Sequence, residues 1–289
     1  MDPTTLALLA TFGAMLFWGL ADFLIQRSVR KLGDLRPLSY IGAFGTLALL
    51  PFILNDFTTL INQQNLYLLL LLSILGLFVS WINFEALRKG KISVVDVIFE
   101  LELPVTVILG FIFLNETFTT LQLSAILVIF LGLILVATKK FNWKHQQGIE
   151  RGVFLSIITA IGLGIINILT GTAAQQASPF LAIWFPWFFI FLATLIIDTS
   201  KNGWKKYCQG IQKYPTLIIT MSIFDTLAWL CFAYAATQQQ IGITIAITEG
   251  YPIIAIILGI CINKEKITPH QYLGMALTLG AAITLATLI

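Results

Sequence analysis

The sequence is poor in charged side chains and in the side chains that hold metals or act as nucleophiles. Charged residues are 11% of the 289 positions, whereas roughly 25% is usual in soluble proteins. The two histidines and three cysteines do not have the spacing of a metal or redox motif. No zinc helix signature, nucleophile elbow, phosphate-binding glycine loop or basic patch occurs. We therefore expect no metal, no cofactor and no nucleic-acid partner, and the composition argues against a soluble enzyme.

The chain has long apolar runs instead. Hydrophobic residues make up 58% of it, and its mean hydropathy is +0.90. A helix needs about 20 apolar residues to cross a bilayer, whereas barrel strands alternate in segments of about 10. Because the runs here are long and apolar on every face, we predict an all-α integral membrane protein with ten transmembrane helices. They cover approximately residues 5–26, 37–54, 66–87, 92–113, 120–138, 152–173, 180–197, 215–236, 241–262 and 269–288.

One segment of the sequence occurs twice. Residues 100–122 return 149 positions later as residues 249–271. This repeat predicts a first five-helix domain over residues 1–140, a linker over 141–150 and a second five-helix domain over 151–289. The identical pairs are Glu100/Glu249, Ile108/Ile257, Leu109/Leu258, Gly110/Gly259, Glu116/Glu265, Thr119/Thr268 and Gln122/Gln271.

The positive charges alternate between connections. All 17 lysines and arginines fall after predicted spans 1, 3, 5, 7 and 9, and the other connections have none. Loops rich in lysine and arginine stay on the cytoplasmic side, so we expect the odd-numbered loops in the cytoplasm of a plasma (inner) membrane and both termini outside. Corresponding loops of the two repeats carry opposite charge patterns. The halves are therefore expected to be inverted relative to each other, as in many secondary transporters.

Two further similarities support the repeat. Thr119-x-x-Gln122 and Thr268-x-x-Gln271 are capping boxes, which predict a helix start at the same place in each half. In the first span of each half, the segments 17–23 and 162–168 resemble each other and place Asp22 opposite Asn167.

Several acids lie inside predicted spans, where an ionisable group is costly and often marks a transport pathway. No lysine, arginine or histidine lies deep in a span to pair with them. Arg27 could reach Asp22 and Arg88 could reach Glu85 at the cytoplasmic rim. The remaining acids must be neutral, face a watered cavity or meet a cation that is substrate or proton. The acids are Asp22, Glu85, Glu100, Glu102, Asp225 and Glu249.

Prolines follow the two repeated glutamates. A proline inside a helix leaves the carbonyl four residues earlier without its donor, so Pro104 frees the carbonyl of Glu100 and Pro252 frees that of Thr248. Interrupted helices of this kind form transporter sites, and a simple kink is the alternative. Glu102 lies about 200° around the helix from Glu100, so one of the two is expected to face a neighbouring helix as a hydrogen-bonding acid.

Tryptophans lie one helical turn from three of the acids. These pairs offer an aromatic wall beside a negative charge, which suits cationic or aromatic ligands, while anchoring at the membrane interface is the alternative. Tyr251 follows Glu249 closely and is a further candidate for this wall. Trp184 and Trp187 are expected to be interfacial. The three pairs are Trp18 with Asp22, Trp81 with Glu85, and Trp229 with Asp225.

The chain resembles the EamA family of the drug/metabolite transporter superfamily over nearly its whole length. The resemblance rests on Phe17-Trp18-Gly19, on the turn at residues 86–93 and on the repeated proline-to-glutamate block. In that block Pro252 leads to Glu265, while the first copy, Pro104 to Glu116, is one residue shorter.

This resemblance implies two inverted five-helix halves and a central cavity lined mainly by spans 1, 3, 4, 6, 8 and 9. It also implies transport without ATP or a bound cofactor. Family members move amino acids, other metabolites or toxic compounds, often outward. Many are drawn with cytoplasmic termini, whereas the charge pattern here predicts termini outside.

We therefore expect a permease, with export favoured, that alternates access around a midplane cavity and acts as a monomer or homodimer. Its small-molecule substrate, and a coupled proton, would meet the acids Glu249, Glu100 and Asp225. Asp22 and Asn167 would be paired polar positions, and Trp18, Trp229 and Tyr251 ligand walls. A lipid-linked-sugar flippase is the alternative of the same class. An intramembrane enzyme is disfavoured, because the scattered acids form no catalytic constellation.

Overall fold

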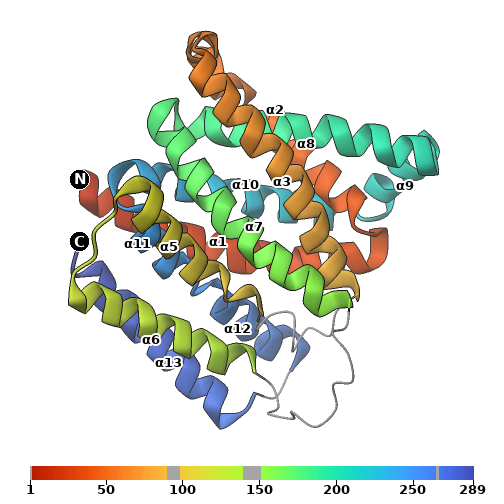
Figure 1. The fold of residues 1–289 in the computed structure, drawn as a ribbon. Helices are drawn as coiled ribbons and strands as arrows, with labels where there is room; N and C mark the ends of the chain where they lie inside the picture. The colour runs from red at the N-terminus through yellow and green to blue at the C-terminus, as the bar shows by residue number, and fades with distance from the viewer. Residues whose placement is uncertain (1, 90–97, 139–150, 265–266) are drawn as a thin grey trace.

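The computed structural model describes residues 2–89, 98–138, 151–264 and 267–289, and all regular structure in these ranges is helical (Figure 1). The first half of the chain contains α1 (Pro3–Leu32), α2 (Leu35–Ile53), the short 3₁₀ helix η1 (Asp56–Ile61), α3 (Gln63–Lys89), α5 (Glu102–Leu114) and α6 (Thr120–Ala137). The second half contains α7 (Arg151–Gln176), α8 (Pro179–Asn202), α9 (Trp204–Lys213), α10 (Pro215–Gln238), α11 (Ile241–Thr248), α12 (Tyr251–Asn263) and α13 (Pro269–Ala286).

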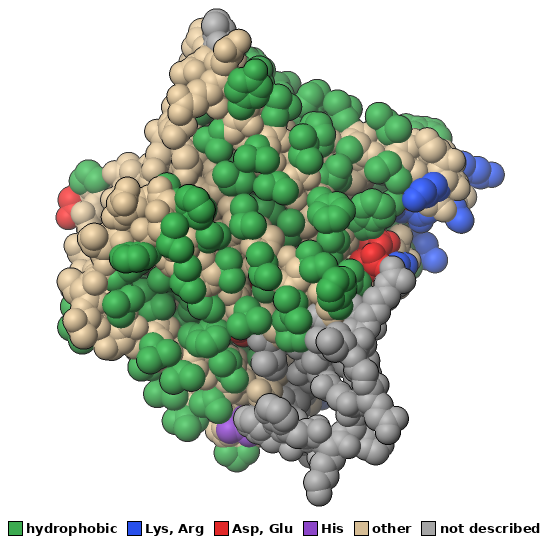
Figure 2. Space-filling model, in the orientation of Figure 1, with side chains coloured by type: hydrophobic (Ala, Val, Ile, Leu, Met, Phe, Trp, Pro, Cys, Tyr) green, Lys and Arg blue, Asp and Glu red, His purple; other side chains and the backbone are tan. Residues whose placement is uncertain are grey.

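Long apolar helices dominate the structure. Among the described residues, eight helical segments are long and apolar enough to cross a membrane, with α11 and α12 counting together as one, and α5 is a shorter apolar helix. Hydrophobic side chains cover the flank of the molecule shown in Figure 2, while lysines and arginines gather at one end. A soluble monomer rarely exposes so large an apolar surface, but a protein in lipid requires it. The predicted all-α membrane fold is confirmed.

The helices differ from the predicted spans in several places. In the predicted span 92–113, residues 92–97 lie outside the described ranges, and a turn at residues 100–101 precedes α5. Residues 241–262 do not form one helix, because α11 ends at Thr248 and α12 begins at Tyr251. The short helices η1 and α9 were not predicted, since neither is long and apolar. The first helix runs to Leu32 rather than residue 26, and ends at Gly33, whose φ of 85° favours glycine.

The main helix contacts join one half of the chain to the other. α1 packs on α10 and α7 on α3, which are corresponding pairs, and α2 packs on α8. The last helices of the two halves, α6 and α13, lie side by side (Figure 1). The two halves are therefore interlocked rather than placed beside each other as separate bundles.

Two side-chain bonds show that α6 and α13 run in opposite directions. Gln122, at the start of α6, donates to the carbonyl of Leu288 beyond the end of α13. Gln271, at the start of α13, donates to the carbonyl of Val136 near the end of α6. Corresponding helices thus point opposite ways, as an inverted repeat requires.

The repeat is reproduced in backbone detail. α5 and α12 begin and end at positions 149 apart, and so do α6 and α13. After α5 and α12 the chain turns through Asn115 and Lys264, with φ of 54° and 55°. Both predicted capping boxes are present, at Thr119 and at Thr268. The tail of the repeated segment therefore builds the same loop and helix start twice.

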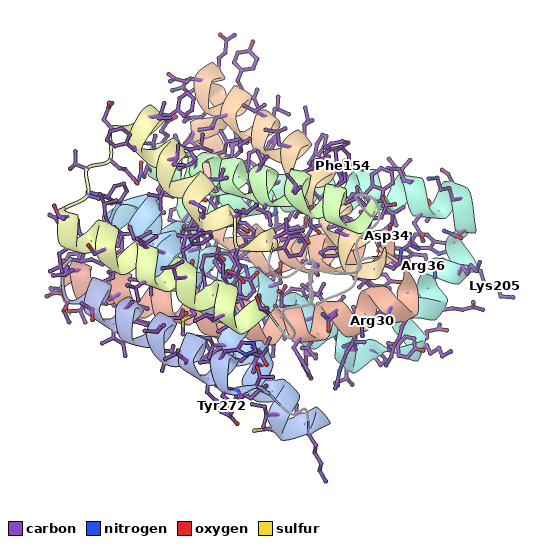
Figure 3. The ribbon with its side chains drawn as sticks, turned by 60° about the horizontal axis from the view of Figure 1, so that its bottom comes forward. Arg30, Asp34, Arg36, Phe154, Lys205 and Tyr272 are labelled. Atoms are coloured by element: carbon purple, nitrogen blue, oxygen red, sulfur yellow. The ribbon has the colours of Figure 1, made fainter. Side chains whose placement is uncertain are left out.

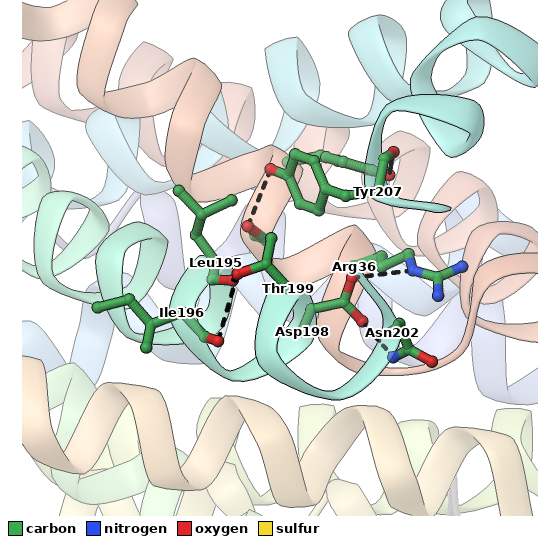
Figure 4. A network of polar contacts seen from close by, with 9 residues as sticks. Arg36, Leu195, Ile196, Asp198, Thr199, Asn202 and Tyr207 are labelled. Carbon is green, nitrogen blue, oxygen red and sulfur yellow. Dashed lines mark hydrogen bonds and ion pairs between the residues drawn. The ribbon is translucent and has the colours of Figure 1, made fainter. Parts of the chain in front are cut away.

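Polar contacts hold the basic end of the bundle together. Figure 3 places Arg30, Asp34, Arg36 and Lys205 at this end. Arg36 forms a 3.0 Å ion pair with Asp198, which also accepts from Asn202 (Figure 4).

Two further contacts extend this network. Arg88, considered as a partner for Glu85, lies 3.4 Å from Asp34. The hydroxyl of Tyr40 donates to the carbonyl of Tyr207 at 2.7 Å. α9 is thereby fixed against α2 on the side where the positive charges gather.

Candidate functional site

The two repeated glutamates lie where helices are interrupted. Glu249 is in the turn between α11 and α12, and Glu100 is in the turn just before α5. The two turns close with similar bonds, from the Leu101 N–H to the carbonyl of Ile98 and from the Gly250 N–H to the carbonyl of Ile247. Both glutamates are buried, each only 3% exposed. An acid therefore lies at the equivalent break in each half.

The prolines lie in the first turns of the following helices rather than inside continuous ones. Pro252 is the second residue of α12, and Pro104 is the third residue of α5. Proline is favoured in a first turn because the helix does not need its N–H there. The one-residue difference between the copies concerns only the proline, since the helix bounds keep their spacing of 149.

Acids from four elements lie close enough for their charges to interact. Asp22 of α1 interacts with Glu102 of α5, Asp225 of α10 and Glu249. Glu249 also interacts with Glu100 and Glu102. Tyr251 interacts with four of these acids, Asp22, Glu100, Glu102 and Glu249. We call Asp22, Glu100, Glu102, Asp225 and Glu249 the acid cluster.

Asn167 joins α7 to the acid cluster. Its side-chain amide donates to Glu102 at 2.7 Å and to Thr106 at 3.3 Å. Glu102 is therefore the acid that bonds to a neighbouring helix, which the sequence left open between Glu100 and Glu102. The second oxygen of Asp225 and the side-chain oxygen of Asn167 are buried and have no hydrogen-bond partner among the described residues. Both are acceptors that a ligand with donors would satisfy.

Two corresponding glycines bring the first helix of each half against the broken helix of the other. A Cβ on Gly19 of α1 would lie 2.4 Å from the Cβ of Ile254 in α12. A Cβ on Gly164 of α7 would lie 2.5 Å from Cγ1 of Val105 in α5, the residue 149 positions before Ile254. The weak similarity between segments 17–23 and 162–168 thus reflects two equivalent helix crossings, which deliver Asp22 and Asn167 to the same site.

Aromatic rings gather next to Tyr251, which interacts with the acid cluster. The rings of Trp18 and Trp229 meet edge to face with centroids 5.1 Å apart, and Tyr251 is 6.5 Å from Trp18. Phe232, which was not expected from the sequence because it has no acid one turn away, packs on both tryptophans. The three predicted wall residues are thus brought together from α1, α10 and α12.

The other two candidates of the sequence lie on α3. Glu85 is half-buried there. The Trp81 ring lies 5.9 Å from Nζ of Lys201, so this tryptophan has a cation of the chain itself as neighbour. α3 also borders an apolar pocket.

A pocket of about 50 Å³ lies between α3, α7, α8 and α10. Its lining is mainly apolar and includes Leu72, Ile166, Trp187 and Trp229. Trp229 therefore contacts both the pocket and Trp18 of the aromatic wall. The prediction that Trp184 and Trp187 are interfacial is wrong, because both are buried between α2 and α8, where Trp184 donates to the carbonyl of Thr46.

α3, α7 and α10 were expected to line a cavity, whereas α8 was not. In the described ranges, no three histidine, cysteine, aspartate or glutamate side chains are grouped so as to hold a metal ion.

Comparison with known proteins identifies the family. The sequence profile of the EamA-like transporter family matches residues 5–138 and again residues 150–287. A solved structure, described as "Crystal structure of protein", superposes with a TM-score of 0.76 at 12% sequence identity, over 98% of this chain and 96% of that one. This likeness shows a shared fold. No curated protein matches the sequence significantly. The chain belongs to the EamA-like transporter family and is a multi-pass membrane transporter.

Proposed function

We propose that this transporter is a permease for small organic cations with an aromatic part, with export as the favoured direction. The observation that carries the proposal is the acid cluster, in which the acids interact with one another and four of them interact with Tyr251, whose ring meets that of Trp18. Amino acids and other small metabolites share the required ammonium group. They are included as weaker ligands when they lack an aromatic ring.

The preference for cations follows from the cost of buried charge. Several ionised carboxylates close together inside a protein repel one another and lose their hydration, which costs several kcal/mol, so protons or a cation are needed to neutralise them. An organic cation supplies positive charge, and its contact with a tryptophan face contributes about 0.5–2 kcal/mol more. The unpartnered acceptor atoms of Asp225 and Asn167 suit an ammonium N–H. An anionic substrate would be repelled by every one of these acids that is ionised.

The helix breaks support an alternating-access mechanism. Glu100 and Glu249 lie at equivalent breaks in two halves whose helices interlock. Movement of one half against the other would shift α5 relative to α12 and change which side of the membrane reaches the acid cluster. Interrupted helices at a repeat interface serve this purpose in many secondary transporters.

Proton coupling is part of the proposal. A carboxyl group that holds a proton is neutral and no longer attracts a cation. Substrate binding would therefore release protons, and protonation would release the substrate. Glu249 is the favoured coupling residue, because it belongs to the second half and interacts with three acids of the first half, Asp22, Glu100 and Glu102.

The proposed orientation puts the basic end in the cytoplasm of the plasma membrane. The described lysines and arginines of α1, α8 and α9 support this placement by the positive-inside rule. The test uses single cysteines introduced at Asn62 and at Lys205 in a chain without its native cysteines. A membrane-impermeant maleimide should label Asn62→Cys in intact cells and Lys205→Cys only after permeabilisation. The reverse result would overturn the orientation.

The function is tested with purified protein and three probes of defined chemistry. Ethidium represents an aromatic cation, tetramethylammonium a cation without a ring, and benzoate an aromatic anion. We expect ethidium to raise the melting temperature most, benzoate not at all, and a proton gradient to drive ethidium into proteoliposomes. If benzoate binds as well as ethidium, or if neither cation binds, the proposed substrate class is wrong.

A further inference from the structure

Glu116 is repeated in the sequence, but it takes no part in the acid cluster. It follows α5 in the loop that leads to α6, and it is 9% exposed. Its carboxylate accepts the backbone N–H groups of Ile241 and Gly242, at 2.5 and 3.0 Å. These are the first two residues of α11. A side chain of the first half therefore caps a helix of the second half.

The space around the carboxylate is closed by two glycines. A Cβ on Gly110 of α5 would lie 2.5 Å from Oε2 of Glu116, and one on Gly242 would lie 3.0 Å from the same atom. The backbone N–H of Glu116 donates to the carbonyl of Gly110, which fixes the loop on its own helix. A methyl group at Gly110 would displace the carboxylate, and one at Gly242 would crowd both the carboxylate and the Phe118 ring.

Two neighbouring contacts strengthen the joint. Gln240, which precedes α11, donates to the carbonyl of Thr117 at 3.0 Å. The ring of Phe118 lies against Gly242, where a Cβ would be 2.8 Å from it. The loop of residues 115–119 thus holds the start of α11 through three successive residues.

The other end of α11 carries Glu249. The helix has 8 residues, which corresponds to about 12 Å. Negative charge at a helix start is favourable because the unbonded N–H groups and the helix dipole point toward it. α11 is therefore a short helix that is capped at one end by Glu116 and ends at the other in Glu249 of the acid cluster.

We propose that Glu116 is a positioning residue, which sets the place of α11 and thereby of Glu249, and links the α5–α6 loop of one half to the acid cluster. This inference rests on the proposed function for its effect on transport. Its effect on α11 itself does not depend on any substrate.

The test compares Glu116→Gln with Thr119→Ala in the full-length protein. The glutamine keeps the size but replaces one acceptor oxygen by a donor that faces an N–H. Thr119→Ala removes the cap of α6 from the same loop without removing a bond to α11. Gly242→Ala is a second variant, because its methyl group displaces the carboxylate.

Two measurements are made on each variant. Hydrogen exchange of the α11 amides should speed up about tenfold in Glu116→Gln and Gly242→Ala, and stay unchanged in Thr119→Ala. Ethidium affinity should fall about tenfold in the first two and stay within about twofold in the third. If Glu116→Gln leaves α11 exchange at the wild-type rate, the positioning role is overturned. If α11 exchange changes as expected but the wild type does not bind ethidium, the proposed function fails and the positioning of α11 stands.

Discussion

The helix breaks at Glu100 and at Glu249 have equivalent backbone turns but different side chains around them. Each has a glutamate in its turn, and each starts its second part at an equivalent residue, Glu102 in one half and Tyr251 in the other. Opposite Glu102 lies the neutral Asn167, whereas the acid Asp22 interacts with Tyr251. In the first pair the acid is on the broken helix α5, and in the second pair it is on the long helix α1, so both acids come from the first half of the chain. A symmetric scaffold produces an asymmetric site, with the hydrogen-bonded acid on one side and aromatic rings on the other.

The largest effect is expected from a substitution that puts an acid on both helices where α5 crosses α7. Asn167→Asp places a second carboxylate within 2.7 Å of Glu102 in place of its donor. Losing a buried bond and adding a buried like charge costs about 3–5 kcal/mol. We expect a melting temperature many degrees lower at pH 8, with partial recovery at pH 5, where one of the two acids can be protonated. Asn167→Ser is the control, since it removes the amide without adding charge, and an equal loss in both variants would contradict this explanation.

Removing the acid on the other side should separate binding from stability. Asp22→Asn takes away one of the interacting acids, so we expect the protein without ligand to be as stable as the wild type or more stable. Ethidium affinity should fall about tenfold, the equivalent of about 1.4 kcal/mol. Thermal unfolding and calorimetric titration give the two quantities. A fall in stability with unchanged affinity would assign Asp22 a purely structural part.

The aromatic side should discriminate between cations. Trp18→Leu and Trp229→Leu remove ring faces but keep an apolar side chain, so ethidium should bind about 2- to 30-fold more weakly, in line with a cation–π contribution of about 0.5–2 kcal/mol. Tetramethylammonium should lose less, because it makes fewer contacts with the rings. Trp184→Leu, in the buried α2–α8 contact, serves as the control. Equal losses for both cations would show that the rings do not select the ligand.

The smallest effect on stability is expected at Glu116, at the opposite end of α11 from Glu249. Burial raises the pKa of its carboxyl above the usual 4.5, and the N–H groups of Gly242 and Ile241 oppose this only in part. Because the pKa is higher in the folded protein than in the unfolded chain, the contribution of Glu116 to stability is full below about pH 4.5 and declines as the pH rises. The melting temperature of the wild type relative to Glu116→Gln should therefore decrease from pH 4 to pH 8. A relative increase over that range would contradict this sign.

The sequence was most informative where it repeats. The capping boxes at Thr119 and Thr268 depend on neighbouring residues only, so the pattern alone placed both helix starts. The inverted halves were expected because the repeat and the alternation of loops rich in lysine and arginine can both be read directly from the sequence. The resemblance between segments 17–23 and 162–168 anticipated that Asp22 and Asn167 occupy corresponding places.

Contacts between distant segments could not be predicted in the same way. The bond that distinguishes Glu102 from Glu100 joins α5 to α7, and only the fold decides which side of α5 faces Asn167. Trp184 had the sequence surroundings of an interfacial residue, but α2 covers it. The bonds from α11 to Glu116 could not be predicted either, since nothing in the sequence shows that the start of α11 lies beside this side chain.

The central claim is that the acids at the helix breaks bind the transported cation. It is tested most directly by calorimetric titration of ethidium into purified wild-type protein, Glu249→Gln and Asp34→Asn. Asp34→Asn is the control, because it neutralises an acid of the Arg88 ion pair at the basic end. We predict that Glu249→Gln weakens ethidium binding at least about tenfold while Asp34→Asn binds like the wild type. Wild-type affinity in Glu249→Gln would contradict the account.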